Sequence, residues 1–304
     1  MKTYLECIPC FFKQALEASK LSKADKMTQK KVLDELSRLI PEIGLNSTPP
    51  EMGRVIYQLV SKITGERDPF KEIKEKSNKQ SLELYPHLKT KIETSNDRLL
   101  TAVRLAIAGN VIDYGVTNHF VIEEEIENCL KGDFAIFDYG DFKEDLDKAD
   151  RILYLADNAG EVVFDKVLIE EIRKLDSPRG RQIFYVVRDK PVINDALVED
   201  ARACGIEKVA EIVSSGSDAP GAILELCSQE FLKLYEHARM IISKGQGNFE
   251  ALSEQDKPIF FLLKAKCSVI AKDIGCRMGD VILKSSTKRK RQLNLKCGFP
   301  CKSS

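Results

Sequence analysis

The first half of the chain carries apolar residues at helical spacing. They recur three and four positions apart, which places them on one face of a helix. This pattern predicts helices over 7–20, 30–40, 51–64 and 99–114. The segment 70–97 is more polar, so we predict one or two exposed helices there. Up to about residue 150 the chain is therefore expected to be helical.

The pattern changes near residue 150, where short apolar runs alternate with helical segments such as 161–175. The runs cover 152–156, 183–187, 209–213, 240–243, 259–263 and 281–283. Strands that alternate with helices form parallel sheets covered by helices. We therefore predict an α/β protein, in which a helical N-terminal subdomain is joined to a Rossmann-like three-layer domain with a mainly parallel sheet. The predicted units are residues 1–148, residues 149–283 and a flexible basic tail over 284–304.

The composition narrows the class of protein. Of 304 residues, 43% are hydrophobic, which is enough for a substantial core and excludes a disordered chain. The 47 basic and 47 acidic residues cancel, so no field of one sign attracts nucleic acid or a membrane. Residues 284–304 hold seven basic and no acidic residues, which leaves the body acidic. No aromatic residues interleave the basic block at 288–291, so nucleic acid is not an expected partner.

The chain is expected to be cytoplasmic. It has no run of roughly 18 apolar residues that could cross a membrane. Its first residues lack the apolar core of a signal peptide. The nine cysteines are an odd number, mostly scattered singly, which is typical of a reducing compartment. The sequence leaves the oligomeric state open.

Polar side chains follow several of the predicted strands. Asp157 and Asn158 come directly after the first strand, and Asp195 follows the second. Ligands of open parallel sheets bind beyond the carboxyl ends of the strands, so these side chains should share one site. Two carboxylates and an amide suit a hard divalent ion and leave positions open for water and a phosphate oxygen.

Cations and glycines follow the later strands. Lys244 and Lys264 would balance the charge of a phosphate, and Gly245 and Gly247 would bring backbone N–H groups close to it. Each residue also has a simpler explanation, because an Asp after a strand often caps a helix, and single lysines and glycines are common on surfaces and in turns. Their joint occurrence at successive strand ends favours metal-assisted phosphoryl chemistry.

Several of these stretches together resemble a known family. The sequence is similar to the metal-dependent damage-control phosphatases, formerly domain of unknown function 89, in the branch typical of archaea and bacteria. The resemblance runs through seven motifs, which are Cys7–Cys10, Gly109–Gly115, Asp157–Glu161, Pro191–Ala196, Ser217–Gly221, Lys244–Glu250 and Leu263–Cys267. It implies hydrolysis of phosphate monoesters of small metabolites, such as sugar phosphates or damaged metabolites, with Mg, Mn, Co or Ni.

The resemblance also implies roles for single residues. Asp157, Asn158 and Asp195 match the metal ligands, with Asp157 and Lys244 as catalytic residues. The positions that match the substrate and phosphate site are Asn110, Asp113, Gly245, Asn248 and Lys264. The spacing of three between Asn110 and Asp113 independently places both on one face of a helix.

Two mechanisms and three functions stay open on the sequence alone. Either water activated by the metal or Asp157 itself could attack phosphorus. An S-adenosylmethionine-dependent carboxyl methyltransferase is the first alternative, although the loop Asp157–Glu161 has a single glycine where that cofactor class usually has two or three. A non-catalytic metal- or metabolite-binding protein is the second. A haloacid-dehalogenase-type phosphatase is disfavoured because Ala159 stands where its second aspartate would be.

The cysteine pair near the N-terminus has the spacing of a metal or redox motif. Cys7 and Cys10 are too close to the start of the chain to follow a strand, which disfavours a thioredoxin-type site. They are either two semi-buried thiols or half of a zinc site completed by Cys297 and Cys301. The five cysteines from Cys129 to Cys276 lie in apolar settings and are predicted to be core thiols.

Overall fold

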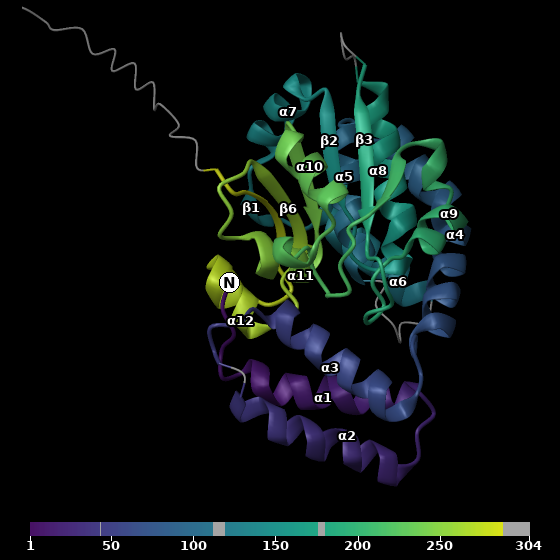
Figure 1. The fold of residues 1–304 in the computed structure, drawn as a ribbon. Coiled ribbons are helices and arrows are strands. Elements are labelled where there is room, and N and C mark those ends of the chain that lie inside the picture. Colours follow the sequence, from purple (N-terminus) through teal and green to yellow (C-terminus); the bar gives the residue numbers. More distant parts are fainter. Residues whose placement is uncertain (43, 112–118, 176–179, 288–304) are drawn as a thin grey trace, which may run out of the picture.

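The structure is a computed structural model, and it describes residues 1–42, 44–111, 119–175 and 180–287. At residues 111 and 119–121 it describes the backbone only. Three helices, α1 (Cys7–Leu21), α2 (Lys26–Leu39) and α3 (Pro49–Thr64), form a layer of their own below the sheet (Figure 1). They enclose a small core that includes Phe11, Ala15, Val32, Leu36 and Ile56. The helical pattern of this region is confirmed.

Local signals explain where these helices begin and end. Asp25 caps α2 by accepting a hydrogen bond from the backbone N–H of Thr28. Thr48 and Glu51 form a reciprocal capping box at the start of α3, and Gly65 ends that helix in the left-handed conformation. Each device satisfies backbone groups that the helix itself leaves unpaired.

The polar segment forms a single helix, α4 (Lys71–Glu93), and one of its faces is buried rather than exposed. Three polar side chains on that face have partners in the sheet domain. Lys74 forms ion pairs with Asp68 and Asp200, and Asn78 also donates to Asp200. Ser81 donates to the backbone carbonyl of Gly160. Buried polar groups that are paired in this way carry no apolar signal, which is why the sequence pattern suggested exposure.

Further helices and one strand connect α4 to the main sheet. They are α5 (Arg98–Ala108), the short η2 (Gly109–Val111), α6 (His119–Lys131), β1 (Phe134–Phe137) and α7 (Tyr139–Lys148). The sequence pattern missed β1, which lies in the part predicted to be helical. It has four residues and pairs with β7 from the other end of the chain, so no local pattern marks it. The division of the chain at residue 148 stays a prediction.

The central sheet has seven strands in the order β1-β7-β6-β5-β2-β3-β4. The remaining strands are β2 (Arg151–Leu155), β3 (Gln182–Val187), β4 (Glu211–Ser214), β5 (Met240–Lys244), β6 (Ile259–Lys264) and β7 (Val281–Ser285). Every neighbouring pair is parallel except β6 and β7. The predicted α/β class with a mainly parallel sheet is therefore confirmed.

Helices cover both faces of the sheet. One face packs against α5 and α8 (Val162–Lys174), and the other against α10 (Gln229–His237), α11 (Gly245–Leu252) and α12 (Ser268–Ile274). Short elements fill the connections, namely η1 (Ile40–Glu42), η3 (Ala159–Glu161), α9 (Val198–Ala203), η4 (Ile206–Lys208) and η5 (Leu224–Leu226). Along β2, Ile152 and Tyr154 enter the first core while Leu153 and Leu155 enter the second. Burial on both sides explains why the strands appear as unbroken apolar runs.

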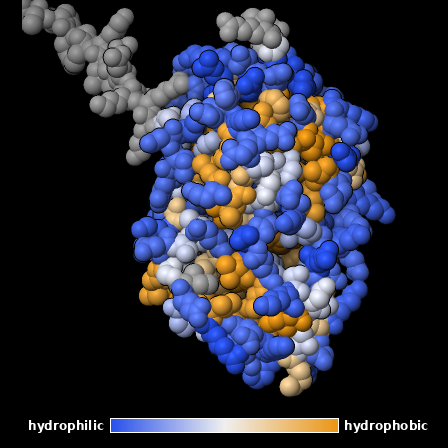
Figure 2. Space-filling view, viewed as in Figure 1, coloured by the Kyte–Doolittle hydropathy of each residue, from blue (hydrophilic) through white to orange (hydrophobic). Residues whose placement is uncertain are grey.

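The outer surface is mixed in character. Figure 2 shows mainly hydrophilic residues on one face of the molecule, with hydrophobic residues in patches between them. Among the described helices, none combines the length and the hydropathy that a membrane span requires. Residues 288–304 of the predicted tail lie outside the described residues.

Candidate functional site

The candidate site lies where the order of strands changes direction. β2 pairs with β5 on one side and with β3 on the other, so the chain proceeds from β2 towards both edges of the sheet. In open parallel sheets such a point leaves a crevice at the carboxyl ends of the strands. The loops after β2, β3 and β5 carry most of the predicted site residues.

The structure brings Asp157, Asn158 and Asp195 together. Asn158 and Asp195 form an isolated antiparallel bridge between the loops after β2 and β3. Two backbone hydrogen bonds hold the same loops, from Ala159 N to Asn194 O at 2.9 Å and from Ala196 N to Asp157 O at 2.8 Å. All three predicted metal ligands are buried yet line one cavity.

The cavity, which we call the carboxylate cavity, has a volume of about 340 Å³. The strand-end loops form one wall, and residues of α1 and α3 form the opposite wall, among them Phe11, Pro50 and Tyr57. The layer of helices below the sheet in Figure 1 therefore closes the site from the side away from the strands. A substrate bound at the strand ends would contact both parts of the chain.

Buried carboxyl groups dominate the electrostatics of this cavity. Burial raises the pKa of Asp157 well above its usual range, and the nearby charges of Glu161 and Asp195 raise it further. The positive charges of Lys266 and Arg188 lower this pKa but do not outweigh the rise. Burial likewise raises the pKa of Asp195, although Arg188 opposes the shift. Carboxylates crowded in this way are stabilised by an added cation.

The donor set fits a hard divalent ion. Asp157, Asn158 and Asp195 offer carboxylate and amide oxygens, which Mg²⁺ and similar ions prefer. Within the described residues, no three carboxylate, thiol or imidazole side chains are grouped as in a closed metal site. Two carboxylates and an amide would leave an ion with open positions, as catalytic sites require.

Lys244 lies beneath the site instead of lining it. Its side chain is fully buried, and Nζ donates to Glu161 Oε2 at 2.9 Å and to Asp165 Oδ1 at 2.7 Å. Burial lowers the pKa of Lys244, but the charges of Asp165 and Glu161 outweigh it and hold the pKa above its usual value. This placement differs from our prediction that Lys244 contacts the phosphate.

The pleat of the strand explains where Lys244 points. Met240 and Ile242 face the core formed with α5 and α8, and Lys244 follows them at the same parity. Its ammonium group therefore meets Asp165, which also accepts hydrogen bonds from Tyr154 and Tyr185. The lysine joins a buried polar network that supports the floor of the carboxylate cavity.

One lysine ends β6 and a second follows it, and only the second lines the carboxylate cavity. Lys264 Nζ donates to Glu125 Oε2 of α6 at 2.8 Å, on the face of the sheet that α5 covers. Lys266 lines the cavity, and its charge lowers the pKa of Asp157. We predicted Lys264 and missed Lys266, although both stand in the same motif, because their spacing does not show which of them enters the site.

Asn248 and Gly245 shape the site without lining it. Asn248 is fully buried, and its amide donates to the carbonyls of Ala156 and Lys244 while it accepts from Arg188 and Ala222. Gly245 has φ +76°, and a Cβ there would lie 1.9 Å from Asp157 Oδ2. Only glycine lets the start of α11 approach Asp157 so closely.

Asn110 reaches the predicted metal ligands from the helical side. Its Nδ2 donates to Asp157 Oδ2 at 3.0 Å and to Glu161 Oε1 at 2.5 Å. Its Oδ1 is buried and has no hydrogen-bond partner among the described residues. Asn110 thus contacts Asp157 but does not line the carboxylate cavity, and its contact with substrate stays a prediction. Asp113, predicted on the same face, lies outside the described residues.

Sequence reasoning missed two charged residues that organise the site. Arg188, almost fully buried, donates to Asp195 Oδ2 at 2.7 Å and to Asn248 Oδ1 at 3.1 Å. Glu161 accepts from Asn110, Asn158 and Lys244. Both follow predicted strands closely, which was the available signal. Their burial and partners depend on several loops that meet only in the fold.

The cysteines divide between the core and the cavity. Cys129 and Cys204 are buried as predicted, and Cys227 and Cys276 are half-buried against the core. Cys267 instead lines the carboxylate cavity together with Cys7 and Cys10, and its sulfur caps α12 by accepting from Ile270 N. Cys297 and Cys301, the other half of the alternative zinc site, lie outside the described residues.

Comparison with known proteins extends over almost the whole chain. Residues 3–282 match the family model described as the damage-control phosphatase ARMT1-like domain. An uncharacterized protein of Methanocaldococcus jannaschii is 40% identical over 288 residues, which cover 91% of this chain and 93% of that protein. A damage-control phosphatase of Pyrococcus horikoshii is 36% identical, with 93% of this chain and 97% of that protein covered.

A solved structure is similar as well. The crystal structure of a DUF89 family protein from Pyrococcus horikoshii superposes with a TM-score of 0.87 at 34% identity, covering 94% of this chain and 100% of that one. The family description and the name of the Pyrococcus relative both support a phosphatase.

Proposed function

Because this chain belongs to the damage-control phosphatase ARMT1-like family, we propose that it hydrolyses phosphate monoesters of small metabolites with a divalent metal ion. The family resemblance seen in the sequence motifs is confirmed by that match. One observation carries the proposal, namely the convergence of Asp157, Asn158 and Asp195 in one cavity, where the charges of Glu161 and Asp195 raise the pKa of Asp157. Crowded carboxylates disfavour a bare phosphate, and a cation between them and the phosphate offsets that repulsion.

Asp157, Asn158 and Asp195 would hold the ion. When bound, a divalent ion supplies Lewis-acid chemistry, which withdraws charge from the phosphate. Arg188 keeps Asp195 in place, and Asn110 and Asn158 both direct their amide nitrogens at Asp157 Oδ2. The amide orientations are thus set before substrate arrives, which spares reorganisation during the reaction.

Lys266 is the cation of this chain that we assign to the substrate phosphate. It lines the carboxylate cavity, whereas Lys244 and Lys264 do not line it. Its ammonium group would stabilise the charge that gathers on the phosphate oxygens as the ester bond breaks. This assignment differs from the role that the resemblance implied for Lys244.

Water is the nucleophile we propose. Asp157 Oδ2 already accepts hydrogen bonds from Asn110 and Asn158, which lowers its readiness to attack phosphorus. A bond forms between the water oxygen and phosphorus, the ester P–O bond breaks, and a water proton passes to the leaving oxygen. A monoester whose phosphate is chiral through oxygen isotopes should therefore release inorganic phosphate with inverted configuration, because a single displacement occurs at phosphorus. Retained configuration would establish two displacements and an aspartyl phosphate on Asp157 instead.

Phosphate release from a panel of sugar and cofactor phosphates tests the proposed function. We expect release with Mg²⁺, Mn²⁺, Co²⁺ or Ni²⁺ and none after chelation. Asp157→Asn should reduce the rate at least about a hundredfold, since it removes a ligand charge. Asp256→Asn, which makes the same change at an exposed position, should leave the rate unaltered. Wild-type rates in Asp157→Asn would overturn the proposal.

A further inference from the structure

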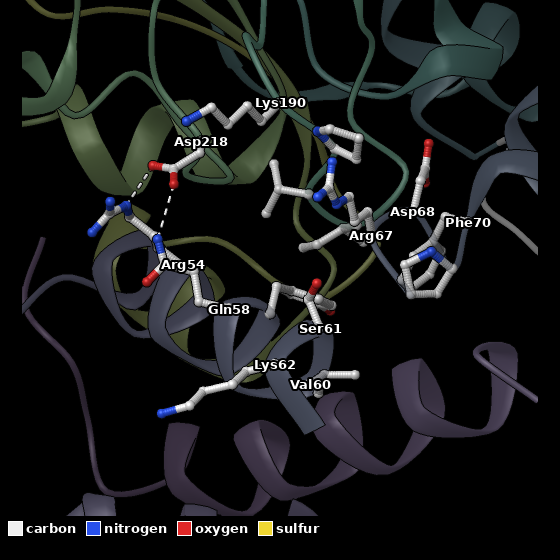
Figure 3. Close-up of a pocket in the computed structure, with 15 residues that line it drawn as sticks. Arg54, Gln58, Val60, Ser61, Lys62, Arg67, Asp68, Phe70, Lys190 and Asp218 are labelled. Atoms are coloured by element: carbon white, nitrogen blue, oxygen red, sulfur yellow. Dashed lines mark hydrogen bonds and ion pairs between the residues drawn. The ribbon is translucent and has the colours of Figure 1, made fainter. Parts of the chain in front are cut away.

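A second cavity adjoins the carboxylate cavity. It has a volume of about 600 Å³ and lies between α3 and the segment 190–193 that follows β3 (Figure 3). Tyr57 and Ile193 line both cavities, so the two spaces share a wall. A ligand held at the strand ends could extend past these two side chains into the second space.

The second cavity has an excess of positive charge, and we call it the cationic cavity. Its two carboxylates are already paired, because Asp218 accepts from Arg54 and Gln58, and Asp68 forms an ion pair with Lys74. Arg67 and Lys190 also line it, and neither forms an ion pair with another described residue. Their two charges are therefore available to a ligand.

The close-up view shows how these side chains lie. In Figure 3 the guanidinium group of Arg67 reaches the middle of the cavity, and Lys190 extends along its upper edge. Lys62, a third lining cation without an ion pair to another described residue, is turned away from both. Asp218 is held by Arg54 and Gln58 from α3, as the dashed lines mark. Two cations, Arg67 and Lys190, thus define the face that a ligand would meet.

The backbone connects the two cavities. Ile193 has φ +45°, a conformation that branched residues rarely adopt and that persists only where the surroundings impose it. Lys190 stands three residues before this point, and Asp195 stands two residues after it. One short segment thus presents a cation to the cationic cavity and a carboxylate to the carboxylate cavity. Such strain gathers at ligand clamps.

We propose that the cationic cavity binds a second anionic group of the substrate, either a carboxylate or a second phosphate. This inference rests on the proposed function, because the phosphate to be cleaved would lie beside Asp157 and Asp195. Arg67 offers a planar fork of N–H donors that matches carboxylate and phosphate oxygens, and Lys190 adds a point charge. The preferred substrates are thus phosphate monoesters with an additional negative charge at their far end.

Matched pairs of substrates test the assignment. 3-Phosphoglycerate differs from glycerol 3-phosphate by a carboxylate, and glucose 1,6-bisphosphate differs from glucose 1-phosphate by a second phosphate. We expect a higher kcat/KM for the member with the additional charge in at least one pair, and the pair that responds identifies which group is bound. The double variant Arg67→Gln/Lys190→Gln should reduce that preference about tenfold, mainly through KM. Arg202→Gln/Lys208→Gln removes the same charges from an exposed site elsewhere and should preserve it.

Calorimetric titration supplies a readout that needs neither turnover nor metal. In the presence of a chelator, the wild-type protein should bind 3-phosphoglycerate or glucose 1,6-bisphosphate more tightly than its partner compound, and the double variant should lose the difference. No preference in the wild type, or an equal loss for both members of a pair, would overturn the subsite. If no ester is hydrolysed with any ion, the proposed function fails, and the titration still decides whether the cationic cavity binds an anion.

Discussion

The carboxylate cavity and the cationic cavity share a wall but are built in opposite ways. In the first, Asp157 and Asp195 are buried and hydrogen-bonded, with Arg188 and Lys244 supporting the carboxylates from below. In the second, the cations Arg67 and Lys190 are exposed and have no ion-pair partner within the described chain. Buried networks hold a fixed geometry, while exposed charges adapt to a ligand at low cost. This contrast matches the proposed division of roles, in which the carboxylate cavity carries out hydrolysis and the cationic cavity selects the substrate.

The largest effect should come from the floor of the carboxylate cavity. Lys244→Met leaves Glu161 and Asp165 buried without their cation, so we expect a loss of about 3–5 kcal/mol in the free energy of unfolding. Lys264→Met breaks a partly exposed pair with Glu125 and should cost about 1 kcal/mol or less. Urea denaturation measures both. Equal losses in the two variants would contradict the claim that the buried ion pairs of Lys244 stabilise the floor of the carboxylate cavity.

A single methyl group tests the geometry above that floor. Gly245→Ala would force a Cβ to within 1.9 Å of Asp157 Oδ2 at φ +76°. We expect a loss of about 2 kcal/mol or more in unfolding free energy and nearly complete loss of phosphate release. Gly275→Ala has a similar φ of +82° with open space around its Cβ, so it should cost about 1 kcal/mol and leave activity intact. Retained activity in Gly245→Ala would contradict the close contact.

The two cavities should also differ in their response to pH. Glu250 lines the carboxylate cavity, and burial raises its pKa to about 7. The charge of Asp273 also raises this pKa, whereas a hydrogen bond from Gln246 and the positive charge of the N-terminus lower it. Burial works in the same direction on Asp218 in the cationic cavity, but hydrogen bonds from Arg54 and Gln58 outweigh it and lower the pKa. The folded protein therefore retains a proton on Glu250 that the unfolded chain releases.

The sign follows from that difference in bound protons. As pH rises from about 4.5 to about 7, Glu250 should contribute a loss of stability on the order of 3 kcal/mol, and it should contribute no further loss above 7. Glu250→Gln should reduce the slope of stability against pH, whereas Glu230→Gln, on an exposed face of α10, should keep it. Unfolding free energies at pH 5, 6, 7 and 8 measure this. An unchanged slope in Glu250→Gln would show that Glu250 is ionised in the fold.

The smallest effect separates Lys264, at the end of β6, from Lys266, just beyond it. Lys266→Gln should lower kcat/KM about tenfold, because Lys266 lines the carboxylate cavity. Lys264→Gln should change it by less than about twofold, since its partner is Glu125 on α6. Steady-state kinetics on one ester decides between them. A larger loss for Lys264→Gln than for Lys266→Gln would show that Lys264 binds the phosphate, as predicted from the sequence.

Comparison of prediction and structure shows which signals in the sequence are reliable. The strands from β2 to β7 were predicted because burial on both faces leaves continuous apolar runs. β1 was missed because its four residues pair only with a strand from the opposite end of the chain. α4 was predicted as exposed because its buried face uses paired polar groups, such as Lys74 and Asn78. Patterns thus detect apolar burial and overlook polar burial.

The candidate site shows the same limit at the level of side chains. Asp157, Asn158 and Asp195 could be predicted together because strand ends of a parallel sheet meet at one edge. The roles of the lysines could not, because Lys244 and Lys264 are turned away by the pleat of their strands, and Lys266 enters the cavity from the loop beyond. Arg188 and Glu161 gained their importance only from partners on other loops.

The amino-acid sequence by itself determined the helices and strands other than β1, the class of sheet and the oxygen-bearing side chains at its edge, since these depend on spacing along a single chain. The tertiary structure alone decided which charges face the cavity, which lie beneath it, and that α3 closes one cavity while forming a wall of another. Those choices depend on distances between segments far apart in the chain. The energy between two charges depends on their separation and on how deeply they are buried, and the order of residues along the chain specifies neither quantity.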